Sequence, residues 1–189
     1  MVLLIDNYDS FSYNLVQMAG SITEDIRVIR NDEMTVEEIR DLHPSHIILS
    51  PGPGYPKDAG VCEEVVRKLQ GEIPILGVCL GHQTICEVYG CTIGHASRLM
   101  HGKQSRIRVK TDNPLFAGME ETILGARYHS LSAYRDSIPE ELEVIADSDD
   151  GEVMAVRHRT YPVYGVQFHP ESILTPEGRK ILENFFQTT

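Results

Sequence analysis

The sequence Ile-Leu-Gly-Val-Cys-Leu-Gly-His-Gln, residues 75–83, decides the fold. It opens with an apolar run typical of a buried strand, and a helical pattern that contains Thr84–Tyr89 follows it. Gly77 and Gly81 flank Cys79 where the strand gives way to the helix. A sharp strand-to-helix turn leaves no room for Cβ atoms beside the residue at its tip, so glycine is expected on both sides. The stretch therefore predicts a strand, a turn that presents a cysteine, and a helix.

Short apolar runs and helical patterns alternate through the first half of the chain. Strands are predicted at Val2–Ile5, Ile26–Ile29, Ile47–Leu49 and Ile75–Val78, and helices at Ser10–Ala19, Thr35–Leu42 and Val61–Leu69. Strands separated by helices imply βαβ units and a parallel sheet that is covered on both faces. We therefore expect a three-layer α/β fold, flavodoxin-like, with a mostly parallel central sheet and a small antiparallel portion.

The second half of the chain contains strand-like segments joined by turns. They are Ile107–Val109, Thr122–Leu124, Leu142–Ala146, Val153–Arg157 and Val163–Phe168, and a last helix is predicted at Glu177–Phe186. Part of this half is expected to be antiparallel, at the sheet edge or in a small side sheet. Because no repeat or long linker divides the chain, a single domain over residues 1–189 is expected.

Composition excludes several classes of protein. The chain has 189 residues, a formal net charge of −11 and 41% hydrophobic residues, which excludes a disordered chain, a fibre and a disulfide-rich miniprotein. A surface this acidic repels phosphate backbones, so nucleic acid is not an expected partner. The amino terminus lacks the basic region of a signal peptide, and no apolar stretch has the length of a transmembrane helix. We expect a cytoplasmic protein without a membrane partner.

Cys79 is the candidate nucleophile. At the amino end of the predicted helix, the helix dipole and free N–H groups favour a thiolate. The N–H of Leu80 can point at a developing oxyanion. The alternative is a buried structural cysteine in a tight turn, and the two flanking glycines favour the nucleophile over it.

His169 is the candidate base, because it directly follows the predicted strand Val163–Phe168. Pro170 holds His169 extended, and residues i and i+2 of an extended segment share a face, so Glu171 can orient the imidazole. The alternative is a His-Pro-Glu turn at the surface. His82 lies nearer to Cys79 in sequence, but it falls on the helix and is interpreted as structural.

A third feature is the loop Ser50–Pro56, which follows the predicted strand Ile47–Leu49 and carries Gly52 and Gly54 between prolines. Backbone N–H groups in such a rigid loop can bind an oxyanion or a carboxylate, and a plain surface turn is the alternative. The loop lacks the dinucleotide-binding fingerprint, and Gly102-Lys103 lacks the spacing of a Walker loop.

These motifs together resemble the class I (triad) glutamine amidotransferases, and within them the glutaminase subunits of anthranilate synthase and aminodeoxychorismate synthase. The stretches that carry the resemblance are residues 4–11, 50–54, 77–83, 101–103, 127–131 and 165–175.

The resemblance implies the following chemistry. Cys79 attacks the side-chain amide of glutamine, His169 moves the proton, and Glu171 orients His169. The backbone N–H groups of Gly52 and Leu80 form the oxyanion hole. A glutamyl thioester is hydrolysed to glutamate, and the ammonia passes to a separate synthase subunit that aminates chorismate.

The resemblance also implies residues for binding and coupling. Glutamine is expected to be held by Gly52, Pro53, Gly54, Gln83, His129, Ser130 and Leu131. His101, Gly102 and Lys103 are expected to couple the chain to the synthase subunit. No metal and no cofactor are expected in this chain, whereas the partner synthase is expected to need Mg²⁺.

Several alternatives remain open on sequence. A receiver-like signalling domain would need an acidic phosphate acceptor where Ser50 stands. A free-standing cysteine hydrolase or peptidase of the same fold would need no partner. A subunit serving guanine nucleotide synthesis is disfavoured by His101–Lys103 and by Ile173–Thr175. Between the two chorismate enzymes, Gly54 leans toward anthranilate, and one subunit can serve both.

Overall fold

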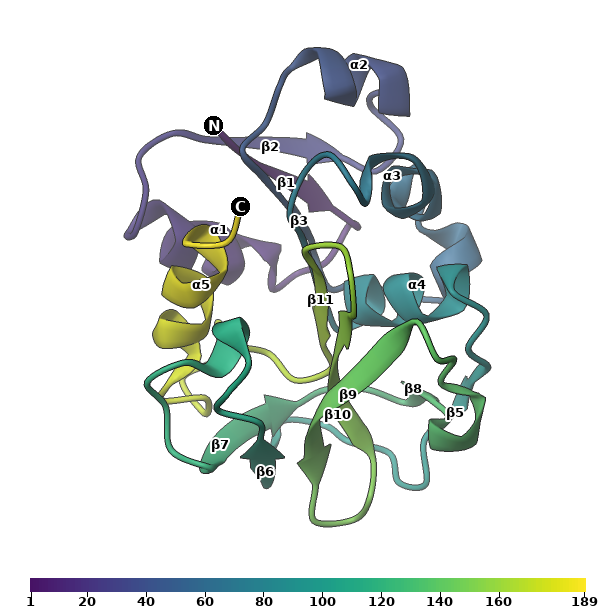
Figure 1. The fold of residues 1–189 in the computed structure, drawn as a ribbon, viewed down its shortest axis with the longest axis vertical. Coiled ribbons are helices and arrows are strands. Elements are labelled where there is room, and N and C mark those ends of the chain that lie inside the picture. The colour runs from purple at the N-terminus through teal and green to yellow at the C-terminus, as the bar shows by residue number, and fades with distance from the viewer.

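The computed structural model describes residues 1–189 and shows a sheet with helices on both of its faces (Figure 1). The strands are β1 (Val2–Asp6), β2 (Ile26–Arg30), β3 (His46–Leu49), β4 (Ile75–Val78), β5 (Ile93–His95), β6 (Lys103–Val109), β7 (Thr122–Arg127), β8 (Leu131–Ala133), β9 (Leu142–Ser148), β10 (Val153–His158) and β11 (Val163–Val166). The α-helices are α1 (Ser12–Gly20), α2 (Val36–Asp41), α3 (Cys62–Leu69), α4 (Leu80–Val88) and α5 (Gly178–Phe186).

The main sheet has nine strands in the order β2-β1-β3-β4-β11-β10-β9-β6-β7. The pairs from β2 through β11 are parallel, and those from β11 through β7 are antiparallel. A separate antiparallel sheet joins β5 and β8. Antiparallel pairing is therefore present in both of the expected places, at the sheet edge and in a side sheet. At the sheet edge it extends over four strands beyond β11.

Alternating apolar residues in β1 produce the layers. Val2 and Leu4 point to one face and pack in a core with α1 and α5. Leu3 and Ile5 point to the other face and pack in a core with α2, α3 and α4. Successive side chains of a strand lie on opposite faces, so a continuous apolar strand needs a cover on both. Figure 1 shows the two helical layers on opposite sides of the sheet.

Among the five α-helices, only α2 begins with a side-chain cap. Thr35 and Glu38 make a reciprocal capping box at the start of α2. The first helix begins at Ser12 rather than Ser10, and Ser10 does not cap it. Asp9 instead accepts a hydrogen bond from the N–H of Phe11 at 3.0 Å, ahead of the helix.

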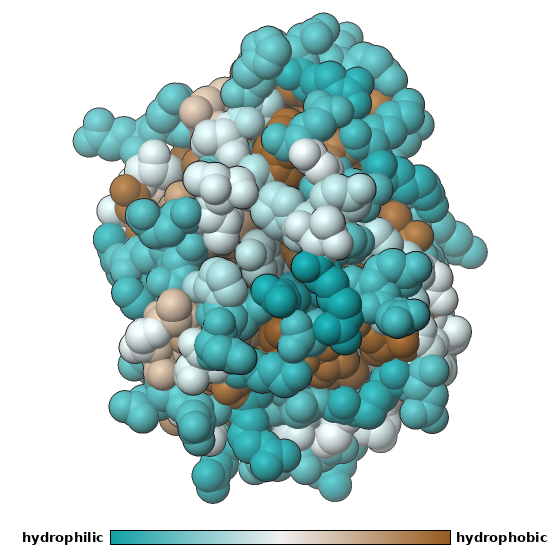
Figure 2. Space-filling model, in the orientation of Figure 1, coloured by the Kyte–Doolittle hydropathy of each residue, from teal (hydrophilic) through white to brown (hydrophobic).

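One face of the molecule is polar over much of its area (Figure 2). Figure 2 shows one face on which hydrophilic residues predominate and apolar residues appear in smaller areas between them. No helix has the length and apolar character needed to span a bilayer.

Candidate active site

Parallel pairing brings the carboxyl ends of β1, β3, β4 and β11 to one edge of the sheet. The segments that follow these strands therefore lie together: Asn7 after β1, Ser50 after β3, Cys79 after β4 and Gln167 after β11. Asn7 joins two of them, since its side chain donates to the carbonyl of Ser50 at 2.8 Å and its N–H donates to the Ser50 hydroxyl at 2.8 Å. Open α/β sheets bind ligands at this edge.

Cys79 occupies a strained turn between β4 and α4. Its backbone has φ 54° and ψ −102°, a region that residues with a Cβ rarely adopt. A Cβ on Gly77 would stand 2.3 Å from the carbonyl carbon of Gly81, and one on Gly81 would stand 2.4 Å from the carbonyl oxygen of Leu49. Both glycines are therefore required by close backbone contacts, as the sequence predicts. Leu80 is the first residue of α4, where N–H groups have no partner within the helix.

His169 and Glu171 form a buried pair beside this turn. Nδ1 of His169 donates to Oε1 of Glu171 at 2.6 Å, and the two side chains are 3% and 2% exposed. The other ring nitrogen, Nε2, is buried without a hydrogen-bond partner. Burial disfavours the imidazolium, but the nearby Cys79 and Glu171 favour it more strongly and raise the pKa of His169 well above its ordinary value. The imidazole therefore lies near the sulfur, with its Nδ1 held by Glu171 and its Nε2 without a partner.

The backbone of His169 is held firmly. Its N–H donates to the carbonyl of Ala126 at 2.9 Å, and its carbonyl accepts from the Thr175 hydroxyl at 2.6 Å. The Tyr128 ring meets the imidazole edge to face with centroids 5.0 Å apart. These contacts restrict the rotation that would take Nε2 away from Cys79.

A cavity of about 190 Å³ opens at Cys79. Every residue expected to bind glutamine lines it, together with Cys79 and Tyr128; the expected ones are Gly52, Pro53, Gly54, Gln83, His129, Ser130 and Leu131. The structure therefore brings together three segments that are far apart in sequence. Tyr128 was not among the expected site residues, although it lies within the motif 127–131, in the segment between β7 and β8.

Gly52, one of the two expected oxyanion donors, lies against the side chain of the other, Leu80. A Cβ on Gly52 would stand 2.6 Å from Cβ of Asn7 and 3.0 Å from Cδ2 of Leu80. The N–H of Gly52 donates to no protein acceptor. It is therefore free to donate to a ligand at the edge of the cavity.

Gln83 and His129 are fixed by hydrogen bonds on the cavity wall. Nε2 of Gln83 donates to the Leu131 carbonyl at 3.0 Å, and Nδ1 of His129 donates to the same carbonyl at 2.9 Å. Burial and the nearby Arg127 charge lower the pKa of His129 to about 4, so it is neutral near pH 7. His82 is fully buried on α4 with its Nε2 3.9 Å from Cys86, in keeping with a structural role.

A second cavity, of about 380 Å³, lies on the other side of the His169–Glu171 pair. Its lining includes Phe11, Tyr128 and Ile173. Ile173 is 94% exposed, so this apolar side chain projects from the rim rather than into the core.

The stretch His101–Lys103 lies close to the site, because Gly102 contacts Tyr128, which lines the cavity at Cys79. Gly102 has φ +62°, and a Cβ on it would stand 3.0 Å from the Tyr128 ring. His101 is exposed, and Lys103 begins β6 opposite Arg127. None of the three lines the cavity at Cys79.

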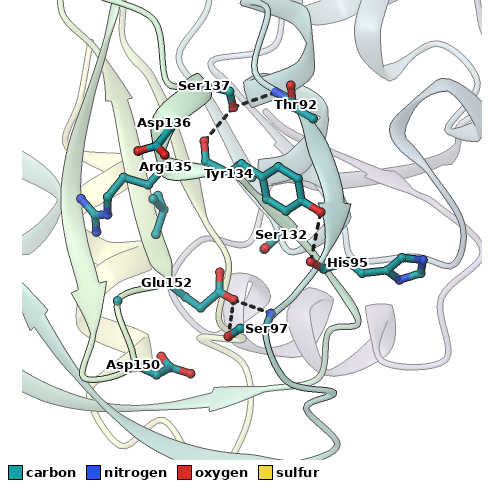
Figure 3. Close-up of a pocket in the computed structure, with 13 residues that line it drawn as sticks. Thr92, His95, Ser97, Ser132, Tyr134, Arg135, Asp136, Ser137, Asp150 and Glu152 are labelled. Carbon is teal, nitrogen blue, oxygen red and sulfur yellow. Dashed lines mark hydrogen bonds between the residues drawn. The ribbon is translucent and has the colours of Figure 1, made fainter.

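A larger cavity, about 630 Å³, lies elsewhere, between the β5–β8 sheet and the β9–β10 turn. Figure 3 shows its polar lining, in which Glu152 accepts hydrogen bonds from Ser97 and Tyr134 donates to the carbonyl of His95. Neither Cys79 nor His169 reaches it. The polar groups there are largely occupied by one another.

The other three cysteines, Cys62, Cys86 and Cys91, are buried and unpaired. Burial raises the pKa of Cys62 to about 12, which suppresses its thiolate. No cluster of three or more His, Cys, Asp or Glu side chains is arranged to hold a metal ion.

Comparison with known proteins agrees with this geometry. The family model "Glutamine amidotransferase class-I" matches residues 3–189. The bifunctional protein TrpGD of Thermotoga maritima is 52% identical over 97% of this chain, which spans 31% of that longer protein. Aminodeoxychorismate/anthranilate synthase component 2 of Bacillus subtilis is 47% identical over 100% of this chain and 96% of its own length. Anthranilate synthase component 2 of Pseudomonas aeruginosa is 50% identical over 99% of this chain and 95% of its own length.

A solved structure shares the fold. The crystal structure of a protein described as a GMP synthase subunit, from Thermoplasma acidophilum, has a TM-score of 0.87 and 23% identity, and the match covers 98% of this chain and 91% of that one. The matched family model, the relatives and the shared fold lead to one conclusion: this chain belongs to the class-I glutamine amidotransferase family.

Proposed function

We propose that this chain is the glutaminase subunit of a synthase that aminates chorismate, with anthranilate as the product. The observation that carries the proposal is a cysteine in a strained turn, at a cavity lined by the Gly52 loop, with the buried His169–Glu171 pair beside it. The relatives named as component 2 support it, because this chain spans nearly the whole length of two of them.

Acylation begins with the Cys79 sulfur as a thiolate and His169 protonated. The sulfur attacks the side-chain carbonyl carbon of glutamine, and the N–H groups of Gly52 and Leu80 donate to the developing oxyanion. His169 then gives its proton to the departing nitrogen, so that ammonia leaves and a glutamyl thioester remains. Glu171 keeps the imidazole oriented and stabilises its charge during this step.

Deacylation uses the same residues in reverse. His169 removes a proton from water, the hydroxide attacks the thioester, and the oxyanion again lies between Gly52 and Leu80. Collapse releases glutamate and restores the thiolate with a protonated His169. All groups in these steps belong to this chain, and no cofactor enters them.

The cavity walls are suited to the amino-acid end of glutamine. Gln83 uses its N–H groups within the protein, so its carbonyl oxygen is available to accept from an ammonium group. Ser130 is exposed at the rim and can donate to a carboxylate. Holding that end fixes the amide beside the sulfur, an orientation effect worth several orders of magnitude in rate, of order 10⁵ or more in favourable cases.

The synthase is proposed to dock around the second cavity. Exposed apolar side chains gather at this rim, where Phe11 is 41% and Ile173 is 94% exposed. An apolar residue this exposed beside a catalytic pair is suited to burial in a partner interface. The cavity shares His169 and Glu171 with the site, so a partner seated there would lie next to the source of ammonia.

The decisive test is a pull-down of the tagged chain from its native cell, followed by assay of the captured complex with glutamine and chorismate. Formation of fluorescent anthranilate is expected. Formation of aminodeoxychorismate instead would assign the chain to the folate branch, and both products would assign it to both enzymes. Full glutaminase turnover by the chain alone, with no synthase captured, would favour a free-standing hydrolase.

Docking is tested with two exposed apolar residues. Ile173→Asp is expected to weaken complex formation and to reduce glutaminase stimulation by the synthase. Leu124→Asp is the matched control, because Leu124 is 41% exposed on β7, outside the second cavity and opposite Arg106. Equal effects of the two variants on complex formation would contradict the docking site.

A further inference from the structure

Gln167 is a buried polar residue that the triad chemistry leaves without a role. It follows β11 immediately and is fully buried. Its Nε2 lies 3.6 Å from the Cys79 sulfur, within the hydrogen-bonding distance of a sulfur acceptor. A buried carboxamide aimed at a nucleophile has a cost unless its hydrogen bonds are satisfied, so each of its contacts needs an explanation.

The orientation of the Gln167 amide is fixed by its neighbour. Nε2 of Gln83 donates to Oε1 of Gln167 at 3.1 Å and to the Leu131 carbonyl at 3.0 Å. A carbonyl only accepts, so the Gln83 atom that faces Leu131 must be nitrogen. That nitrogen also faces Gln167, whose facing atom must be oxygen. The Gln167 NH₂ group is therefore the end that faces Cys79.

The hydrogen bonds at the far end of the network, from Arg127 through His129 to Leu131, also have a fixed direction. Nε of Arg127 donates to Nε2 of His129 at 3.1 Å, and an arginine can only donate. His129 must then carry its proton on Nδ1, which donates to the Leu131 carbonyl at 2.9 Å. Arg127 is itself held by Asp150 at 3.1 Å. Donor-only and acceptor-only groups thus set the direction of every hydrogen bond in the network.

We propose that Gln167 is a further catalytic residue, which holds the Cys79 sulfur as a thiolate by donating a hydrogen bond to it, and that Gln83 positions it. This inference rests on the proposed function, in which Cys79 is the nucleophile. Hydrogen bonds to the charged form of a group favour that form, and bonds to an anion are about twice as strong as neutral ones. The donor also limits the positions that the sulfur can take when it attacks.

The titratable groups around the sulfur are accounted for. His169, with Glu171 behind it, lies on the segment after β11, and His129, with Arg127 behind it, lies on the cavity wall. His169 supplies the positive charge and the proton. Gln167 does not titrate, so its contribution is a constant stabilisation of the thiolate that adds to that of His169.

The test measures the rate at which iodoacetamide alkylates Cys79 as a function of pH, with the modified cysteine identified by mass spectrometry. Gln167→Met keeps the approximate size and removes the donor, so the midpoint of the pH profile is expected to rise by about one pH unit. Glutaminase kcat near pH 7 is expected to fall about tenfold, with KM little changed. Gln70→Met, a bonded glutamine outside the cavity, is the control and should leave the midpoint unchanged.

Gln167→Glu is the second variant, and it keeps the acceptor for Gln83 while replacing the donor with a negative charge. Its midpoint is expected to rise further than that of Gln167→Met. A wild-type midpoint in either folded variant would overturn the role of Gln167. Failure of the proposed function is a separate result, because it would appear as glutaminase activity that survives Cys79→Ser.

Discussion

A Cβ atom placed on Gly81 would stand 2.4 Å from the carbonyl oxygen of Leu49, so the first turn of α4 lies directly on the end of β3. This contact sets how closely the helix that follows Cys79 approaches the loop that carries Gly52. The close approach is possible because Gly81 has no side chain, and it brings together the two segments that carry the proposed oxyanion donors, Gly52 and Leu80.

Gly81→Ala is therefore expected to lower the free energy of unfolding by about 3 kcal/mol, since backbone must move to admit the methyl group. Gly20→Ala is the matched control at the end of α1, where a Cβ would meet no atom within 4 Å. That change is expected to be neutral or to stabilise the protein by about 0.5 kcal/mol. Urea unfolding at equilibrium measures both, and equal losses would contradict the contact.

The division of labour between subunits predicts the behaviour of Cys79→Ser. In the complex with its synthase, glutamine-dependent product formation is expected to vanish, because serine at this position is not ionised. Synthesis from added ammonium salt is expected to continue, because it bypasses the thioester. Loss of both activities in a folded complex would refute the assignment of Cys79 as the glutaminase nucleophile.

The triad is expected to act as a unit. Cys79→Ala and His169→Ala should each remove nearly all glutaminase turnover, and the double variant should be no slower than either single one. The reason is that His169 and Cys79 exchange one proton, so removing either ends the same step. Single-turnover rates for the three variants test this, and losses that multiply would contradict a shared role.

Two buried histidines predict how stability depends on pH. Burial, with a smaller effect of the neighbouring His129, lowers the pKa of His82 to about 3, and burial, then the charge of Arg127, lowers that of His129 to about 4. Between about pH 4 and 6.5, His82 and His129 are protonated in the unfolded chain and neutral in the folded protein. Stability therefore rises with pH there, by about 1.4 kcal/mol per pH unit for each histidine.

His82→Met removes one of these groups and is expected to reduce the slope by about 1.4 kcal/mol per pH unit. Urea unfolding of the wild type and the variant at several pH values gives the slope of the free energy of unfolding against pH for each. The carboxylates contribute equally to both slopes, so their contribution cancels in the difference. An unchanged slope would mean that His82 is already charged in the folded protein.

Much of the site follows from local sequence. Gly77 and Gly81 around Cys79 predict the strained turn, because only glycine tolerates the backbone contacts made there. Glu171, two residues after His169, predicts their pairing, because an extended segment places both on one face.

Other features could not be predicted from local sequence. The strands β5 and β8 were not predicted, since three-residue strands carry too little periodicity to recognise. A small antiparallel portion was expected, but its extent over four strands continuous with β11 through β10 was not. Gln167 lies close to His169 in sequence without any sign that it faces Cys79, from which it is separated by 88 positions.

The sequence by itself determined the α/β class, the cysteine turn, the His-Glu pair and the family, because each depends on residue types at short, fixed spacings. Only the tertiary structure decided that β11 lies beside β4, which brings His169 and Gln167 to Cys79. It also decided that Gln83 and His129 both donate to the carbonyl of Leu131. The physical reason is that strand order and side-chain packing depend on contacts between residues far apart in the chain, for which local periodicity carries no signal.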